Sequence, residues 1–172
     1  MRRALALLLA CGWLAMAAPC AHADASARAA QLAVALDRLE AGDAVTARRL
    51  LEPLAQDGSA LAETMLGGLH ARGLGVARDP ATAAAFWWRA AQRGYPPAQL
   101  ALAKALAAGE GVRASPESAL RWALLAAQGG DDAVRAAADR LRLELSRKVD
   151  ARAAGRASAR AAAFRPWSPT EP

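Results

Sequence analysis

The stretch GLGVARDPATAAAFWWRAAQRG, residues 73–94, occurs a second time thirty-six residues later, as GEGVRASPESALRWALLAAQGG at 109–130. Both copies begin with Gly-x-Gly-Val, continue to a proline, carry an aromatic residue in the middle and end on a glycine. Recurrence at a fixed period of this length is typical of stacked repeat architectures. We therefore expect each copy to be one unit of a repeat array.

The coincidences extend beyond alanine, which supplies 51 of the 172 residues. The positions that agree at the shift of 36 are Leu66 and Leu102, Gly73 and Gly109, Gly75 and Gly111, Val76 and Val112, Pro80 and Pro116, Ala83 and Ala119, Phe86 and Trp122, Ala90 and Ala126, Ala91 and Ala127, and Gly94 and Gly130. An earlier, degenerate copy is in phase at Asp43, Ala47, Leu50, Ala55 and Gly58. We conclude that the repeat is genuine.

Each unit can be interpreted as two helices joined by a glycine loop. The first helix of the middle unit is expected at about 60–71, and Gly73 can take the left-handed conformation that ends a helix. Asp79 is placed to cap the second helix, with Pro80 in its first turn and Ser115 repeating the cap in the next unit. Because no segment alternates with a period of two, the predicted class is all-α.

The predicted architecture is an array of about three helix pairs with a capping helix at each end, as a short array requires. The predicted segments are a signal peptide at 1–23, repeats at about 24–58, 59–94 and 95–130, a capping helix at 131–145, and a basic Arg/Ala-rich helix with a Pro-rich tail at 146–172. We expect a break in the closing helices near Gly155, because glycine is a poor helix former.

The start of the chain has the three parts of a secretory signal: basic Arg2 and Arg3, an apolar run, and small residues that predict cleavage after Ala23. Both cysteines lie in this segment, so the mature chain would have no thiol. A lipid-attachment signal ending at Cys11 has too short an apolar run before it, and we do not expect lipid anchoring. The predicted location is the periplasm or the exterior.

The repeat resembles the Sel1-like repeat family, relatives of the tetratricopeptide repeats, and the chain resembles an exported bacterial member over about 30–132. The matching residues of the middle unit are Ala62, Leu66, Gly67, Gly73, Gly75, Val76, Asp79, Ala83, Ala90, Ala91 and Gly94. His70 and Phe86 stand at the family's tyrosine and tryptophan positions. The last unit has Ala103 for a glycine but keeps Trp122. The resemblance implies a right-handed α-solenoid that works as a scaffold or adaptor by binding proteins.

The shared positions are expected to have structural roles. Alanines allow helices to cross closely, and Phe86 and Trp122 fill the space between repeats. The full set is Leu66, Gly67, Gly73, Gly75, Val76, Asp79, Ala83, Phe86, Ala90, Ala91, Gly94, Leu102, Gly109, Gly111, Val112, Ser115, Ala119, Trp122, Ala126, Ala127 and Gly130.

No motif for an enzyme, cofactor or metal site is found. His70 is the one histidine beyond the predicted signal and stands at a packing position of the repeat. The loop that begins at Gly73 follows no strand and precedes no lysine, so it does not predict a phosphate site. The pI of about 10.6 alone does not indicate nucleic-acid binding, because no binding motif accompanies it. We expect no enzyme, no cofactor and no bound metal.

Residues outside the repeat pattern are the candidates for interaction. Arg152, Arg156 and Arg160 are spaced by four and would share one helix face, where they either contact an anionic partner or are simply solvated. Trp88 is expected to be partly exposed, and either anchors a partner or packs between repeats. Trp167, in the tail RPWSP, is a further candidate.

Two functions follow from these features. The first is a periplasmic scaffold that holds another envelope protein on the concave surface formed by the first helices of the pairs. The alternative is a binder of an anionic envelope polymer or membrane surface through the basic closing helix. We expect a monomer in either case, and neither hypothesis names the partner.

Overall fold

The computed structural model describes residues 18–167, with side chains from residue 25 onward. Most of the predicted signal segment, including Cys11, therefore lies outside the described residues, and the predicted cleavage after Ala23 falls within the first helix. The described part of the chain contains helices and no strand, as predicted. The helices are α1 (Ala18–Glu40), α2 (Ala44–Gln56), α3 (Ala60–Arg72), α4 (Pro80–Gln92), α5 (Pro96–Ala108), α6 (Pro116–Gly129), α7 (Asp132–Ser146) and α8 (Ala151–Ala162).

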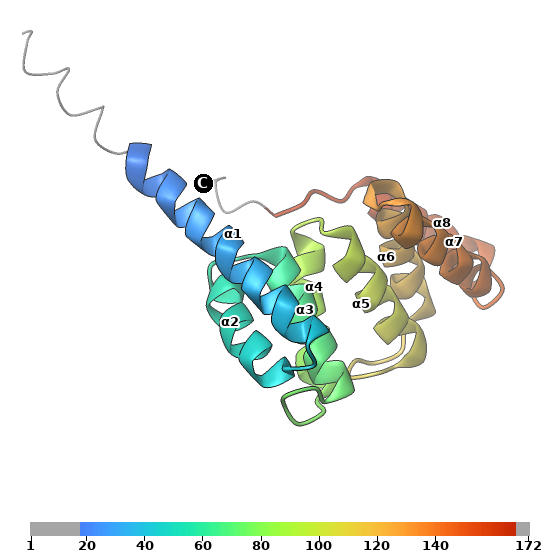
Figure 1. The fold of residues 1–172 in the computed structure, drawn as a ribbon. Helices are drawn as coiled ribbons and strands as arrows, with labels where there is room; N and C mark the ends of the chain where they lie inside the picture. Colours follow the sequence, from blue (N-terminus) through green and yellow to red (C-terminus); the bar gives the residue numbers. More distant parts are fainter. Residues whose placement is uncertain (1–17, 168–172) are drawn as a thin grey trace, which may run out of the picture.

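Successive helix pairs stack into a solenoid (Figure 1). The pairs are α1 with α2, α3 with α4, and α5 with α6, and the first helix of each later pair also packs against the second helix of the pair before it. At the end of the array, α7 packs against α5 and α6, and α8 packs against α6. None of the helices within 18–167 is both long and apolar enough to span a membrane.

The predicted helix boundaries are confirmed by the caps. The Asp79 carboxylate accepts hydrogen bonds from the backbone N–H groups of Ala81 and Thr82, which satisfies donors that the first turn of α4 leaves free. Ser115 caps α6 in the same way, through the N–H of Ser118. Gly73 ends α3 in the left-handed conformation, with a φ of 70°.

The second glycine of each loop makes a close contact between repeats. A Cβ built on Gly75 would lie 2.7 Å from the backbone carbonyl carbon of Ala44, at the start of α2. One repeat later, a Cβ on Gly111 would lie 2.0 Å from the carbonyl oxygen of Pro80, at the start of α4. These distances are too short for any side chain, so the repeat period depends on these glycines for its spacing as well as for their positive φ.

One pair of core positions differs in side-chain size between two successive repeats. Gly67 lies against Trp87, whose indole N–H donates to the carbonyl of Thr64 at 3.2 Å. The equivalent positions one repeat later are Ala103 and Ala123, both fully buried. The departure from the family's glycine at Ala103 is therefore accompanied by the loss of the large ring at its partner position.

The closing segment differs from the sequence-based expectation. The predicted break at Gly155 is wrong, because Gly155 lies inside α8. The helices part instead between Ser146 and Ala151, where Asp150 caps α8 by accepting from the N–H of Ala153. Ala157 of α8 is fully buried in the same core cluster as α6, so the basic helix is an integral part of the solenoid end.

Candidate functional site

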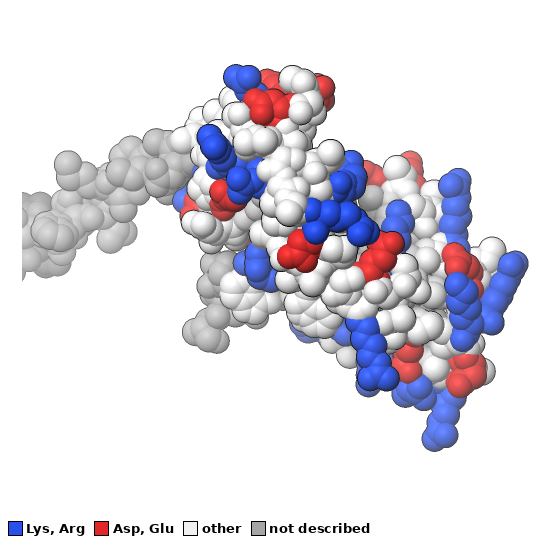
Figure 2. Space-filling view, turned by 90° about the horizontal axis from the view of Figure 1, so that it is seen from below, with Lys and Arg blue, Asp and Glu red and all other residues white. Residues whose placement is uncertain are grey.

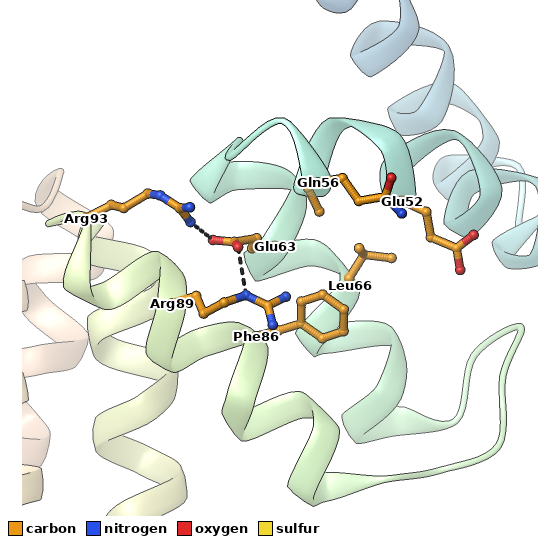
Figure 3. Close-up of a pocket in the computed structure, with 8 residues that line it drawn as sticks. Glu52, Gln56, Glu63, Leu66, Phe86, Arg89 and Arg93 are labelled. Carbon is orange, nitrogen blue, oxygen red and sulfur yellow. Dashed lines mark hydrogen bonds and ion pairs between the residues drawn. The ribbon is translucent and has the colours of Figure 1, made fainter. Parts of the chain in front are cut away.

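The first groove is a hollow of about 510 Å³ between α2 and α4, with α3 as its floor (Figure 3). The lining combines repeat positions such as Leu66 and Phe86 with residues that the repeat pattern leaves free, such as Glu63 and Arg89. The lining residues are Glu52, Ala55, Gln56, Glu63, Leu66, Phe86, Arg89 and Arg93. The open space thus lies between the second helices of two successive pairs, whereas we expected a partner on the surface of the first helices.

A buried carboxylate organises one end of the first groove. The side chain of Glu63 on α3 is only 2% exposed, and its two oxygens pair with two guanidinium groups from α4 (Figure 3). Nε of Arg89 donates to Oε1 at 2.9 Å, and Nη1 of Arg93 donates to Oε2. Pairing and hydrogen bonding of this kind are needed to keep a carboxylate ionised inside a protein.

The wall of the first groove contains one aromatic residue, the half-buried Phe86. The Phe86 ring stacks on His70, with ring centroids 5.6 Å apart. The guanidinium carbon of Arg89 lies 4.6 Å from the centroid of the same ring, within the range of a cation–π contact. His70 therefore has the packing role that its place in the repeat predicts. No cluster of metal-ligating side chains is found among residues 18–167.

The end of the chain crosses the equivalent place one repeat later, between α4 and α6, which we call the second groove. We call Phe164–Trp167 the tail. Phe164 packs edge-to-face on Trp122, with ring centroids 5.6 Å apart, and the Trp167 N–H donates to the carbonyl of Gln92 at 2.8 Å. Between them, two ring carbons of Pro166 lie 3.1 Å from the place of a Cβ on Gly94. Figure 1 shows the segment after α8 running back toward α4.

The two grooves share one frame and differ in charge. Leu66 and Leu102 occupy equivalent floor positions, and Phe86 and Trp122 occupy equivalent wall positions. Gln99 is buried like its counterpart on α3, but it is neutral and donates to the carbonyl of Ala91 at 3.3 Å. The pairs that differ in charge are Glu63 and Gln99, Arg89 and Leu125, and Arg93 and Gly129.

One side chain touches both grooves. Arg93 pairs with Glu63 in the first groove, and its guanidinium carbon lies 5.1 Å from the centroid of the Trp167 ring. Its Nη2 also lies 3.4 Å from the place of a Cβ on Gly58, which is the counterpart of Gly94. The arginine thus covers in the first groove the position that Pro166 covers in the second, where the residue equivalent to Arg93 is Gly129.

The two tryptophans predicted as interaction residues, Trp88 and Trp167, both lie at the second groove. Trp88 is 45% exposed, as expected, and its ring lies 5.7 Å from that of Trp122. Trp167 is 56% exposed and shares a small hollow with Trp88, although its backbone is held by the end of α4. Both residues therefore have an intramolecular role in addition to any role in binding.

The predicted basic row is partly neutralised, because one carboxylate pairs with two of its three arginines. Nε of Arg156 donates to Glu117 of α6 at 3.1 Å, and Nη1 of Arg160 lies 3.6 Å from the same carboxylate, while Arg152 is exposed. The hydrogen bond from Arg156 holds the pKa of Glu117 below its ordinary value. Figure 2 shows acidic side chains interspersed with basic ones across the face that it presents, including the end where α6–α8 lie.

Sequence reasoning did not find Glu63, Arg89 or Arg93 as a group. These residues are separated by up to 30 positions, and they meet only because α3 and α4 pack side by side. One signal was available: Glu63 and Gln99 are polar, occur at the same place in two repeats, and precede the core residues Leu66 and Leu102 by three positions. On a helix, that spacing puts a polar side chain on the buried face.

No family model matches the chain, and no curated protein is similar to it in sequence. Its fold is nevertheless similar to that of crystallised proteins. One is a protective antigen present in uropathogenic Escherichia coli strains that displays an SLR fold, with a TM-score of 0.68, 21% identity, and coverage of 84% of this chain and 34% of that one. Another is a Sel1 repeat protein from Oxalobacter formigenes, with a TM-score of 0.59, 22% identity, and coverage of 66% of this chain and 46% of that one.

This chain spans less than half the length of either neighbour. At these identities the comparison concerns the fold and not a shared partner. The repeat period, the glycine loops and the stacked helix pairs of this chain are consistent with that fold. The chain has the Sel1-like repeat fold that its sequence resemblance predicted.

Proposed function

We propose that the chain is a non-catalytic scaffold that binds another protein in its first groove. The Sel1-like repeat fold is one associated with protein–protein interaction. The observation that carries the proposal is the first groove itself: an open hollow with a half-buried aromatic wall and a fixed pair of arginines. Interfaces use such aromatic and arginine side chains as their main anchors.

The competing function, binding of an anionic surface by the basic closing helix, has weaker support. Two of the three arginines that define its face are engaged by Glu117. A shared carboxylate reduces the charge that this face presents to an anionic surface.

Export to the periplasm is part of the proposal, and the three-part signal at the start of the sequence supports it. Fractionation of cells that express the chain, followed by N-terminal sequencing, tests it.

The experiment for the scaffold is affinity capture by the immobilised chain, compared among three forms. The wild type and the basic-face variant Arg152→Gln are expected to retain the same protein. Phe86→Ala, which removes the aromatic wall, is expected to lose it. Capture that is retained by Phe86→Ala and lost by Arg152→Gln would contradict the proposal and favour the basic face. Circular dichroism of each variant establishes that the repeats remain folded.

Truncation before α8 is not a suitable test of the basic face. Removal of α8 would expose Leu145 and Trp122, which are buried in the core cluster that α8 helps to form. A loss of binding would then report unfolding of the solenoid end. Single substitutions at exposed positions avoid this problem, because such changes usually alter stability by no more than about 0.5 kcal/mol.

A further inference from the structure

The tail shows what kind of segment lies on a groove of this architecture. It is extended, places an aromatic ring against the wall at Trp122, and donates a backbone N–H to the carbonyl of Gln92 at the end of α4. The first groove has the counterparts of these features: Phe86 in the wall and the carbonyl of Gln56 at the end of α2. An extended segment with an aromatic anchor therefore suits the Phe86 wall of the first groove, although Arg93 covers there the place that Pro166 takes in the second groove.

The charges of the first groove add a second requirement. Two guanidinium groups share one carboxylate, so the cluster of Glu63, Arg89 and Arg93 carries one net positive charge. Opposite them, Glu52 is neutralised by its pair with Arg48. The Arg89 side chain is 52% exposed and only its Nε is engaged by Glu63, which leaves N–H donors directed away from that carboxylate. Arginine in this state binds carboxylates through its remaining donors.

From these observations we propose that the first groove binds an extended segment of a partner protein that combines an aromatic side chain with a nearby carboxylate. The aromatic ring packs on Leu66 and Phe86, and the carboxylate pairs with Arg89. The inference rests on the proposed function and names the chemistry of the partner. Because Arg89 lies on the Phe86 ring and an extended chain advances about 3.3 Å per residue, the two groups are expected within about two residues of each other.

A second copy of this chain is a poorer occupant. The tail carries Arg165 between its aromatic residues and no carboxylate within Phe164–Trp167. The groove that it crosses has Leu125 and Gly129 at the positions where the first groove has two arginines. The tail thus matches the neutral groove in which it lies, and the first groove selects for the opposite charge.

The test begins with selection of random twelve-residue peptides on the immobilised full chain, followed by synthesis of the enriched peptides. The expected result is enrichment of an aromatic residue with Asp or Glu within about two positions. Fluorescence anisotropy then measures the affinity of a labelled peptide. Arg89→Leu, which installs the residue of the next repeat, is expected to weaken binding about tenfold, and added salt is expected to weaken it further.

The matched control lies on the other groove. Trp88→Ala removes an exposed aromatic ring that does not line the first groove, and is expected to change the affinity by less than about twofold. Phe86→Leu, which keeps an apolar wall without the aromatic ring, is expected to weaken binding while preserving the fold. Thermal unfolding of each variant identifies any loss of binding that comes from unfolding.

Three results would overturn the inference. Enriched peptides without acidic residues, or with affinity unaffected by Arg89→Leu, would exclude the proposed chemistry. Peptides that lose affinity on Trp88→Ala would place binding on the second groove. Equal binding by a peptide of residues 161–172 would make the tail of a second copy the occupant. If any of these occurs while capture still depends on Phe86, the scaffold function stands and only the partner chemistry fails.

Discussion

The first and second grooves are built from the same repeat but present opposite chemistry. Both have a leucine floor and an aromatic wall, and both end at the C-terminus of a second helix. The first is open and holds a buried ion cluster, whereas the second is neutral and is crossed by the tail. The repeat period therefore determines the arrangement of helices that both grooves share. The charge of each groove is determined by three positions, which are Glu63, Arg89 and Arg93 in the first groove and Gln99, Leu125 and Gly129 in the second.

Those three positions must change together. A buried carboxylate on the floor requires cations on the wall, and a neutral amide does not. In the second groove Gln99 is satisfied by a backbone carbonyl, so Leu125 and Gly129 can be apolar and small. Gly129 has no long side chain that could cover Gly94, and Pro166 of the tail lies against Gly94 instead. Five substitutions or sets of substitutions test these differences through their effect on stability. The largest effects are expected where the ion cluster is disturbed.

Installing only the wall of the second groove in the first should be strongly destabilising. The double variant Arg89→Leu with Arg93→Gly leaves Glu63 buried and without its cations, and is expected to cost about 3–5 kcal/mol in the free energy of unfolding. Adding Glu63→Gln, which completes the neutral set, should restore most of this stability. Urea denaturation of both variants checks the result, and a triple variant no more stable than the double would refute the coupling.

The loop glycine of the last unit should be the next most sensitive position. Gly111→Ala places a Cβ about where the Pro80 carbonyl lies and forces a positive φ on alanine, so it is expected to destabilise the fold by about 3 kcal/mol. The control is Gly155→Ala on α8, where the space is open and alanine should stabilise by about 0.5–1 kcal/mol. Thermal unfolding that shifts equally for both would contradict the stacking role.

The pair of Gly67 and Trp87 should show compensation. Gly67→Ala brings a methyl group against the indole ring and is expected to cost about 2 kcal/mol. Combining it with Trp87→Ala recreates the alanine pair of the next repeat, so the second substitution should cost less in this background than alone. A double-mutant cycle measures the coupling, and strict additivity would show that the two positions do not compensate.

The tail should contribute modestly to stability. Trp167→Ala removes a half-exposed ring that lies over Arg93, and is expected to cost about 0.5–1 kcal/mol. The backbone hydrogen bond to Gln92 is retained in this variant, so the tail should stay in place. Hydrogen exchange of the Trp167 amide reports on that bond. Complete loss of protection would show that the ring, and not the backbone, holds the tail.

The smallest effect is a dependence on pH from Glu117. Its carboxyl has a pKa lowered in the folded state, so the pair with Arg156 adds stability above the unfolded-state pKa of about 4.5 and loses it as the pH falls through the folded-state value. The stability difference between wild type and Glu117→Gln should therefore shrink between about pH 6 and pH 3. A difference that is constant over this range would show that the pair contributes nothing.

The frame was predictable from the sequence because its determinants are local. Asp79 and Ser115 mark the caps, Gly73 marks a helix end, and the period of 36 places each pair. The prediction of a break at Gly155 was wrong because it rested on the poor helix propensity of glycine, whereas the capping residue Asp150 sets the start of α8. Burial of α8 against α6 evidently outweighs the poor propensity of Gly155.

The contents of the grooves were not predictable, because they depend on contacts between helices. Glu63 and its arginines occupy positions that the repeat leaves free, and a charged residue at such a position usually indicates a solvated face. The tail lies against Gly94 and Trp122, both far from it in sequence. The sequence could have indicated the ion cluster and the place of the tail through a comparison of the positions at which successive repeats differ.

A photo-crosslinking residue placed at two equivalent positions distinguishes what lies in each of the two grooves. In cells that express the full chain, a probe at Gln92 should link within the chain to the tail, and a probe at Gln56 should link to a different protein. Substitution of Arg89 by leucine should remove the second product and leave the first. Links from Gln56 only to the chain itself, or a partner link that survives the loss of Arg89, would contradict the account.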